Sequence, residues 1–124
     1  MTAFMMSFDV CVHGTGPVGM SLALALSRQG LSVAWVRPAE TPPAAADVRT
    51  YALSQTSVAL LQQLKIWSAL PADARTAVTR MHVEGDAAGA ALDFAADAQG
   101  VDALSWIVDA AELERTLRSA LGFA

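Results

Sequence analysis

Apolar and polar positions near the amino terminus follow three successive patterns. A short apolar run at residues 8–12 is typical of a buried strand. Apolar residues then recur at helical spacing up to Gly30, a residue type that often ends helices, and Val33 and Trp35 return to the alternation of a strand. The patterns therefore predict a strand, a helix and a second strand, which form a βαβ unit over residues 8–37.

Glycines at GxGxxG spacing lie between the first strand and the helix of this unit, at Gly14, Gly16 and Gly19. This spacing is a dinucleotide fingerprint, in which the first glycine allows a tight turn, the second lets the backbone approach a pyrophosphate and the third lets the helix pack closely. Pro17 suits the first helical position, and the unpaired amides of the turn that continues through Val18 favour an anion. These five residues form the predicted pyrophosphate site.

Three further groups of elements follow a proline-rich stretch at residues 38–46, which predicts a loop. A helical pattern predicts a helix over about residues 54–65, with Ser54 as its N-cap. The spacing then changes to strict alternation, which predicts a β-hairpin over about residues 79–96. An apolar run and another helical pattern predict a strand and a helix over about residues 104–121.

Two local predictions concern single side chains. Asp109 and Glu112 have the spacing of a capping box at the start of the last helix. Cys11 lies inside the apolar run of the first strand, so we expect a small buried core residue rather than a reactive thiol. As the only cysteine, Cys11 can form no disulfide within the chain.

Composition and charge exclude several classes of function. The formal net charge is −4, and the eight Lys and Arg residues form no basic stripe, which argues against a nucleic-acid partner. His13 and His82 have no Cys or His partner at ligand spacing, so we expect no metal site. Because the sequence shows neither a targeting segment nor an apolar stretch long enough to span a bilayer, it predicts a cytoplasmic protein.

Three stretches of the chain occur in this order in one known family. They are residues 14–19 (GTGPVG), residues 47–54 (DVRTYALS) and residues 60–67 (LLQQLKIW). On these residues the chain resembles the FAD-dependent aromatic hydroxylases, the group A flavoprotein monooxygenases. Within that group it is similar to the ubiquinone-biosynthesis hydroxylases, whose substrates are polyprenylated phenols, and the similarity continues through the hairpin to residue 121.

The resemblance implies an α/β fold, in which this chain is an incomplete FAD-binding Rossmann-like (βαβ) domain. The inserted β-hairpin would belong to a substrate domain. The resemblance also implies a reaction in which NAD(P)H reduces FAD, the reduced flavin reacts with dioxygen, and a hydroxyl group reaches an aromatic small-molecule substrate.

Carried over onto this sequence, the resemblance assigns Gly14, Gly16 and Gly19 to the pyrophosphate loop. Arg49 matches the arginine that lies near the flavin in such enzymes. The alternative for Arg49 is a surface charge paired with Asp47. We name no catalytic residue within these 124 residues.

Arg37 departs from the family pattern, because a dinucleotide fold normally carries an acid here that binds the ribose hydroxyls. An arginine offers donors but no acceptor. The residue therefore leaves three alternatives open. In the first, the chain binds FAD more weakly than its relatives do. In the second, it is a degenerate nucleotide-binding or assembly module without catalysis. In the third, it is an NADP-binding Rossmann domain whose arginine binds the 2′-phosphate.

The chain ends just after its last predicted helix, so we expect residues 1–124 to be the amino-terminal part of one FAD-binding domain and to be inactive alone. Strand edges and an apolar hairpin face left without partners predict a homo-oligomer or an edge-paired dimer of these residues. A lipophilic substrate would add a peripheral association with a membrane.

Overall fold

The computed structural model describes residues 5–39 and 46–124 of the chain. Residues 40–45 of the predicted proline-rich loop lie outside this description. The described elements are β1 (Val10–His13), α1 (Pro17–Arg28), β2 (Val33–Val36), β3 (Thr50–Leu53), α2 (Gln55–Gln63), the 3₁₀ turns η1 (Trp67–Ala69) and η2 (Ala72–Ala74), β4 (Arg75–Val78), β5 (Arg80–Glu84), β6 (Ala91–Ala95), η3 (Asp97–Gln99), β7 (Ser105–Asp109) and α3 (Ala110–Leu121).

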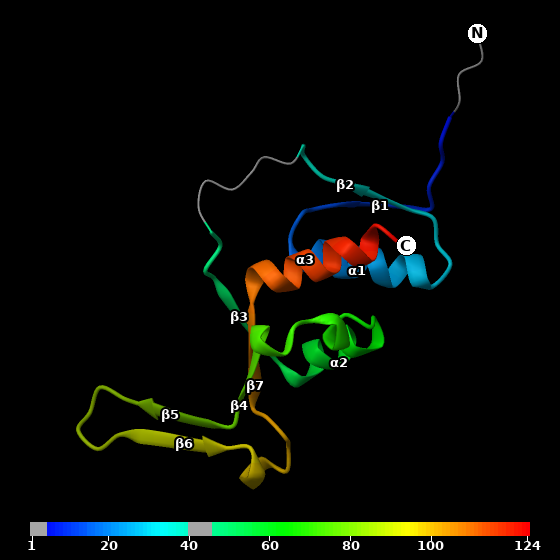
Figure 1. Cartoon of the computed structure of the whole chain (residues 1–124). Coiled ribbons are helices and arrows are strands. Elements are labelled where there is room, and N and C mark those ends of the chain that lie inside the picture. The colour runs from blue at the N-terminus through cyan, green and yellow to red at the C-terminus, as the bar shows by residue number, and fades with distance from the viewer. Residues whose placement is uncertain (1–4, 40–45) are drawn as a thin grey trace.

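The predicted βαβ unit is confirmed. Strands β1 and β2 pair in parallel with Val10 opposite Val33 and His13 opposite Val36, and α1 connects them. Pro17 is the first residue of α1, as predicted. Helix α3 packs beside α1, and the two helices run in the same direction, so their amino termini lie at the same end (Figure 1). The amino-terminal part of α3 therefore lies at the same end of the molecule as the loop that leads from β1 into α1.

A second sheet holds two strands that the sequence patterns did not predict. Its strand order is β3, β7, β4, and both outer strands pair antiparallel to β7. Apolar and polar residues do not alternate clearly in either strand, whose sequences are TYAL in β3 and RTAV in β4. Their pairing depends on β7, which comes much later in the sequence, so the stabilising contacts of both strands are tertiary.

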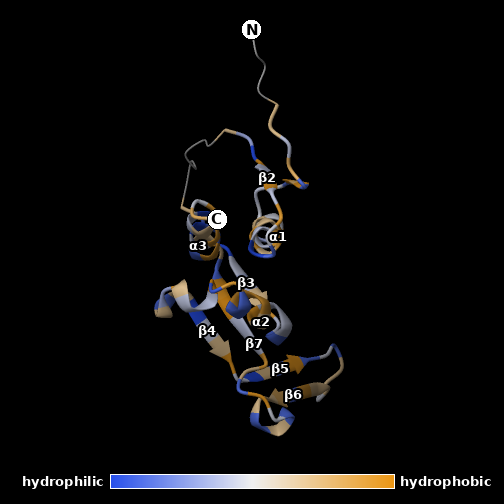
Figure 2. Ribbon diagram, turned by 90° about the vertical axis from the view of Figure 1, so that its right-hand side faces the viewer, coloured by the Kyte–Doolittle hydropathy of each residue, from blue (hydrophilic) through white to orange (hydrophobic). Residues whose placement is uncertain are grey.

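The predicted hairpin is confirmed as β5 and β6, in a sheet of their own. Met81 lies opposite Phe94 and Val83 opposite Leu92, so these four apolar side chains share one face. All four are exposed in this chain, and Figure 2 shows apolar residues along both strands. The hairpin thus presents an uncovered apolar face.

The main core lies between the three helices and β7. Its buried members come from α1, α2, the segment after α2, β7 and α3 and are Met20, Leu24, Val58, Leu61, Leu64, Ile66, Trp67, Leu70, Val108, Leu113 and Leu117. The ring of Trp67 meets the ring of Trp106 edge to face, with centroids 5.1 Å apart. This core joins the βαβ unit to the three-stranded sheet.

Helix α2 is shorter at its carboxyl end than predicted. Ser54 is its N-cap, as expected, and the side chain accepts a hydrogen bond from the Ser57 amide at 3.2 Å. The last helical residue is Gln63, and Lys65 adopts a left-handed conformation with φ of 62° just beyond it. The Lys65 residue that was expected inside the helix therefore ends it.

Two other local predictions are wrong. Asp109 occupies the N-cap position of α3, but its side chain makes no capping hydrogen bond, and Glu112 pairs with Arg115 at 2.6 Å. The capping box does not form because Glu112 has this partner within its own helix. Cys11 is exposed although its neighbour Val12 is buried, because successive strand residues face opposite sides and only the Val12 side meets the core.

Candidate dinucleotide-binding site

The glycine loop between β1 and α1 is tightly closed on itself. A Cβ atom added to Gly19 would lie 3.3 Å from the Gly14 carbonyl oxygen and 3.4 Å from the Gly14 carbonyl carbon. The loop can therefore keep this shape only without a side chain at Gly19. Gly14 does not adopt a positive φ, so its part in the tight turn is this close approach and not a left-handed backbone.

Gly16 lies on the open side of the same loop. A Cβ atom added there would meet nothing within 4 Å, and Gly16 is the N-cap of α1. Within the described residues no side chain caps this helix end and its first turn holds no acidic residue, so neither offsets the positive end of the helix dipole. An anion fits at this end, where the first amides of a helix have no intrahelical acceptor. The pyrophosphate prediction for the loop is thus compatible with the geometry.

Trp35 and Arg37 border this loop from the end of β2. The Trp35 Nε1 donates a hydrogen bond to the Gly14 carbonyl oxygen at 2.6 Å, and the Gly14 amide donates to the Val36 carbonyl at 3.4 Å. The guanidinium carbon of Arg37 lies 4.8 Å from the centre of the Trp35 ring. The structure therefore brings Arg37 close to the glycine loop, where it offers donors and no acceptor to a ribose.

Arg49 precedes β3 and is held by an acidic side chain, as the alternative prediction stated. Its Nε and Nη2 donate to the two carboxylate oxygens of Asp47 at 3.0 and 2.9 Å. This hydrogen bonding lowers the pKa of Asp47 to about 2. The Arg49 carbonyl accepts a hydrogen bond from the Ala110 amide at 3.0 Å, which places the residue at the amino terminus of α3.

Glu114 on α3 joins Asp47, Arg49 and Tyr51 in a group of contacting side chains, the Arg49 cluster. Sequence reasoning missed this member. Its Oε1 lies 3.8 Å from Arg49 Nη2 and accepts a hydrogen bond from the Tyr51 hydroxyl at 3.1 Å. Burial, and next the hydrogen bond to Glu114, raise the pKa of Tyr51. No spacing in the sequence could have revealed this contact, because it depends on the packing of α3 beside β3.

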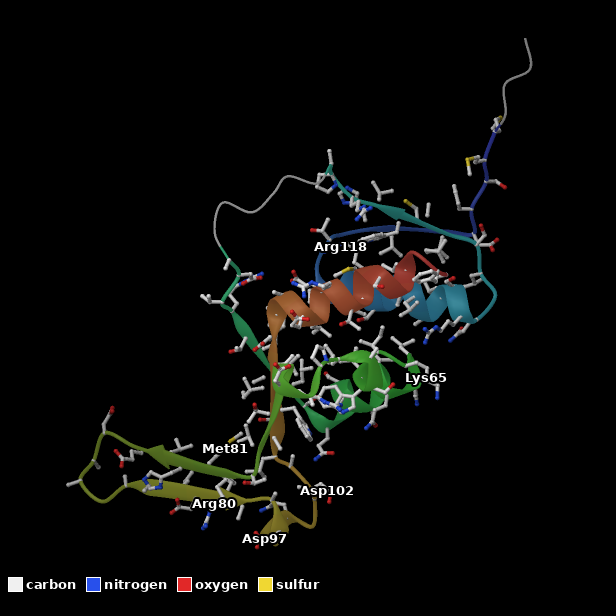
Figure 3. The ribbon with its side chains drawn as sticks, viewed as in Figure 1. Lys65, Arg80, Met81, Asp97, Asp102 and Arg118 are labelled. Carbon is white, nitrogen blue, oxygen red and sulfur yellow. The ribbon has the colours of Figure 1, made fainter. Side chains whose placement is uncertain are left out.

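A separate hollow of about 430 Å³ lies at the base of the hairpin. Its walls are formed by Thr79, Arg80, Ala96, Asp97, Val101 and Asp102. Figure 3 shows Arg80, Asp97 and Asp102 there, at the far end of the molecule from Arg118 on α3. The hollow shares no residue with the glycine loop or with the Arg49 cluster.

The model of one protein family, described as an FAD binding domain, matches residues 7–122 of the chain. The chain belongs to the FAD binding domain family. This match covers every predicted site residue. In this family assignment the glycine loop fits the pyrophosphate of FAD, whereas Arg37 does not fit as an acceptor for its ribose.

One curated relative is the 3-demethoxyubiquinol 3-hydroxylase of Escherichia coli (strain K12). It is 40% identical over 68 residues, which are 52% of this chain and 17% of that enzyme. The match thus spans about a sixth of the relative's length. The similarity supports the FAD assignment but leaves most of that enzyme without a counterpart here.

Solved structures show the same fold. The Pseudomonas aeruginosa protein PqsL, in complex with 2-aminobenzoylacetate, has a TM-score of 0.70 at 22% identity, over 94% of this chain and 31% of that one. Klebsiella pneumoniae HpxO, complexed with FAD and uric acid, has a TM-score of 0.67 at 19% identity, over 92% of this chain and 28% of that one. The expected α/β fold of a partial FAD-binding domain is therefore confirmed. Within the described residues, no helix is long and apolar enough to cross a membrane.

Proposed function

We propose that the native protein containing this chain is an FAD-dependent monooxygenase that hydroxylates an aromatic ring, with NAD(P)H as the reductant. We further propose a polyprenylated phenol of the ubiquinone pathway as its substrate. The observation that carries the proposal is the open, uncapped helix end at Gly16 in a chain of the FAD binding domain family. The similarity to the Escherichia coli hydroxylase supports the substrate class.

In this proposal each group of the loop has one task. The amides at the start of α1 bind the pyrophosphate, and Gly16 leaves the space through which it approaches. Gly19 keeps α1 against the Gly14 turn, and Trp35 holds the Gly14 carbonyl so that the turn keeps its shape. FAD, once bound, supplies the oxygen-activating chemistry of the hydroxylation.

A polyprenylated substrate also bears on where the protein works. Such a molecule partitions into a bilayer, so we propose a cytoplasmic protein that meets its substrate by peripheral association with a membrane. A homo-oligomer belongs to the same proposal, because the hairpin leaves an apolar face uncovered in this chain.

The test is the purification of the native protein with its full reading frame. We expect a yellow protein that contains FAD, oxidises NAD(P)H faster when an aromatic substrate is added, and yields a product one oxygen atom heavier by mass spectrometry. A colourless protein whose melting temperature rises with NADPH would instead support an NADP-binding domain, which the Arg37 position favours. A colourless protein that binds neither cofactor would support the degenerate module.

A further inference from the structure

Asp47 holds the guanidinium of Arg49 in a defined orientation. It accepts from Nε and Nη2 with both carboxylate oxygens, the paired arrangement that fixes the plane of a guanidinium. The Arg49 amide also donates to Asp47 at 3.1 Å, so the carboxylate is tied to the backbone that it orients. Among the described residues the hydrogen bonds of this guanidinium involve Nε and Nη2, which leaves the two Nη1 donors for a ligand.

Glu114 holds the same guanidinium from a second element. Its carboxylate lies 3.8 Å from Arg49 Nη2 and is itself fixed by the Tyr51 hydroxyl, and the Arg49 guanidinium carbon lies 6.0 Å from the Tyr51 ring centre. The Arg49 side chain is 64% exposed, whereas the side chain of Glu114 is only 20% exposed. An exposed arginine is thus held by two carboxylates whose side chains are much less exposed, Asp47 at 26% and Glu114 at 20%.

The cluster lies at the end of the molecule where the proposed cofactor site begins. The Arg49 carbonyl accepts from the first amide of α3, and α3 and α1 run side by side from the same end (Figure 1). The Gly16 loop precedes α1 at that end. Arg49 therefore lies at the end of the molecule where both helices begin.

We propose that Asp47, Tyr51 and Glu114 are positioning residues that hold Arg49 ready to bind the phosphates of FAD. This inference rests on the proposed FAD site. Asp47 fixes the guanidinium plane, and Glu114, held by Tyr51, prevents its rotation away from α3. Pre-ordering a flexible side chain increases affinity because less conformational freedom is lost on binding.

The position and the charge of Glu114 have opposite effects on an anionic ligand. Two carboxylates against one guanidinium give the cluster a net charge of −1, which repels phosphate, while the position of Glu114 keeps Arg49 in place. A glutamine at this site keeps an acceptor for the Tyr51 hydroxyl and removes the charge. The effect of position can therefore be separated from the effect of charge.

The experiment is an FAD titration of the native full-length apoprotein and its variants. We expect Arg49→Ala and Glu114→Ala each to weaken FAD binding about tenfold, whereas Glu114→Gln binds at least as tightly as the unchanged protein. Glu112→Ala is the matched control, because it removes another carboxylate of α3 that pairs with Arg115 and lies outside the cluster. This control should leave FAD affinity unchanged.

A double variant distinguishes positioning from a general loss of structure. If Glu114 acts through Arg49, adding Glu114→Ala to Arg49→Ala should cause no further loss of FAD affinity. An equal loss in both backgrounds would overturn the inference and would indicate a structural role. If Arg49→Ala weakens binding while Glu114→Ala and Asp47→Ala do not, the positioning inference fails and the FAD site stands. If the unchanged protein binds no FAD, the proposed function and this inference fail together.

Discussion

At the scale of single residues, the site is formed by side chains whose partners lie far away in the sequence. Trp35 fixes the Gly14 carbonyl, and Tyr51 fixes Glu114. The close approach of Gly19 to Gly14 could be predicted from the glycine spacing, because it depends on backbone geometry within one loop. The partners of Arg49 could be predicted only in part. Asp47 is two residues away, whereas Glu114 reaches Arg49 only through the packed fold.

Tyr51 is the single tyrosine of the chain, so its ionisation can be followed directly by tyrosinate absorbance. Because burial and the Glu114 carboxylate raise the pKa of Tyr51, we expect its hydroxyl in the 124-residue chain to ionise with a pKa above the ordinary value of 10.0. A raised pKa in the folded state means that this group stabilises the fold fully below pH 10.0, and that the contribution is lost as the pH rises through the raised pKa.

Replacement of Glu114 by glutamine should lower the Tyr51 pKa toward the ordinary value, since the carboxylate charge is removed and the partial burial remains. Glu112→Gln on the same helix should leave the titration unchanged. An identical Tyr51 titration in the Glu114→Gln chain would show that the two side chains are not in contact.

Arg37 gives a second prediction at this scale. Arg37→Glu places an acceptor for ribose hydroxyls beside the glycine loop, so we expect FAD to bind the native protein about tenfold more tightly. Arg37→Ala is the control, because it also removes the contact with the Trp35 ring but adds no acceptor. Calorimetric titrations that give Glu and Ala variants the same FAD affinity would contradict the ribose assignment.

At the scale of elements, strong periodicity over many residues was sufficient for prediction. The βαβ unit, the hairpin and the helices α2 and α3 follow from their spacing. Strands β3 and β4 could not be found in this way, since their residues show no clear alternation and their pairing depends on β7. The capping box failed because Glu112 pairs with Arg115, and Cys11 was misplaced because one face of β1 lies outside the core.

The ends of α1 and α2 use the same motif with different residues. After α1, Gly30 has φ of 88° and donates to the Ser27 carbonyl at 3.0 Å. After α2, Lys65 has φ of 62° and donates to the Gln62 carbonyl at 3.1 Å, and the next amide donates to Leu61 at 2.9 Å. Lys65 thus adopts a conformation that favours glycine.

Lys65→Gly should therefore stabilise the chain by about 0.5 to 1 kcal/mol, because relief of left-handed strain outweighs the added freedom of the unfolded chain. Lys65→Ala keeps the Cβ atom and should bring no such gain. The free energy of unfolding in urea measures both variants. A Gly variant that is no more stable than the Ala variant would show that Lys65 carries no such strain.

At the scale of the whole molecule, the helices and β7 share one core while the hairpin extends away with an exposed apolar face (Figures 1 and 2). Residues Val83 and Leu92, opposite one another on that face, are 51% and 63% exposed. Each Å² of apolar surface that stays in water forfeits about 25 cal/mol of the stabilisation that burial would give. The edges of the two-stranded hairpin add unpaired backbone groups.

The isolated 124-residue chain should accordingly self-associate through the hairpin. Sedimentation velocity should show a weight-average mass that rises with concentration, and the double variant Leu92→Thr, Phe94→Thr should reduce it because it makes the exposed face polar while keeping strand-forming residues. Ala91→Thr, on the opposite face of β6, is the control. A compact monomer at all concentrations would contradict this prediction.

We also expect no NADPH oxidation by the isolated chain with added FAD.

Gly16→Val tests whether the pyrophosphate of FAD binds at the loop from Gly14 to Gly19. Apart from its two chain neighbours, no described residue lies within 4 Å of a Cβ at this position, and the Gly16 φ of −87° and ψ of 177° suit any residue, so the fold should persist. The new side chain would fill the path of the pyrophosphate.

The measurement is the flavin content of the purified native protein, with far-UV circular dichroism as the check on folding. Ala59→Val, on the exposed side of α2, adds the same bulk away from the loop. We predict that Gly16→Val retains the dichroism spectrum and loses FAD, while Ala59→Val retains both. Full flavin content in a folded Gly16→Val protein would show that the cofactor does not bind at this loop.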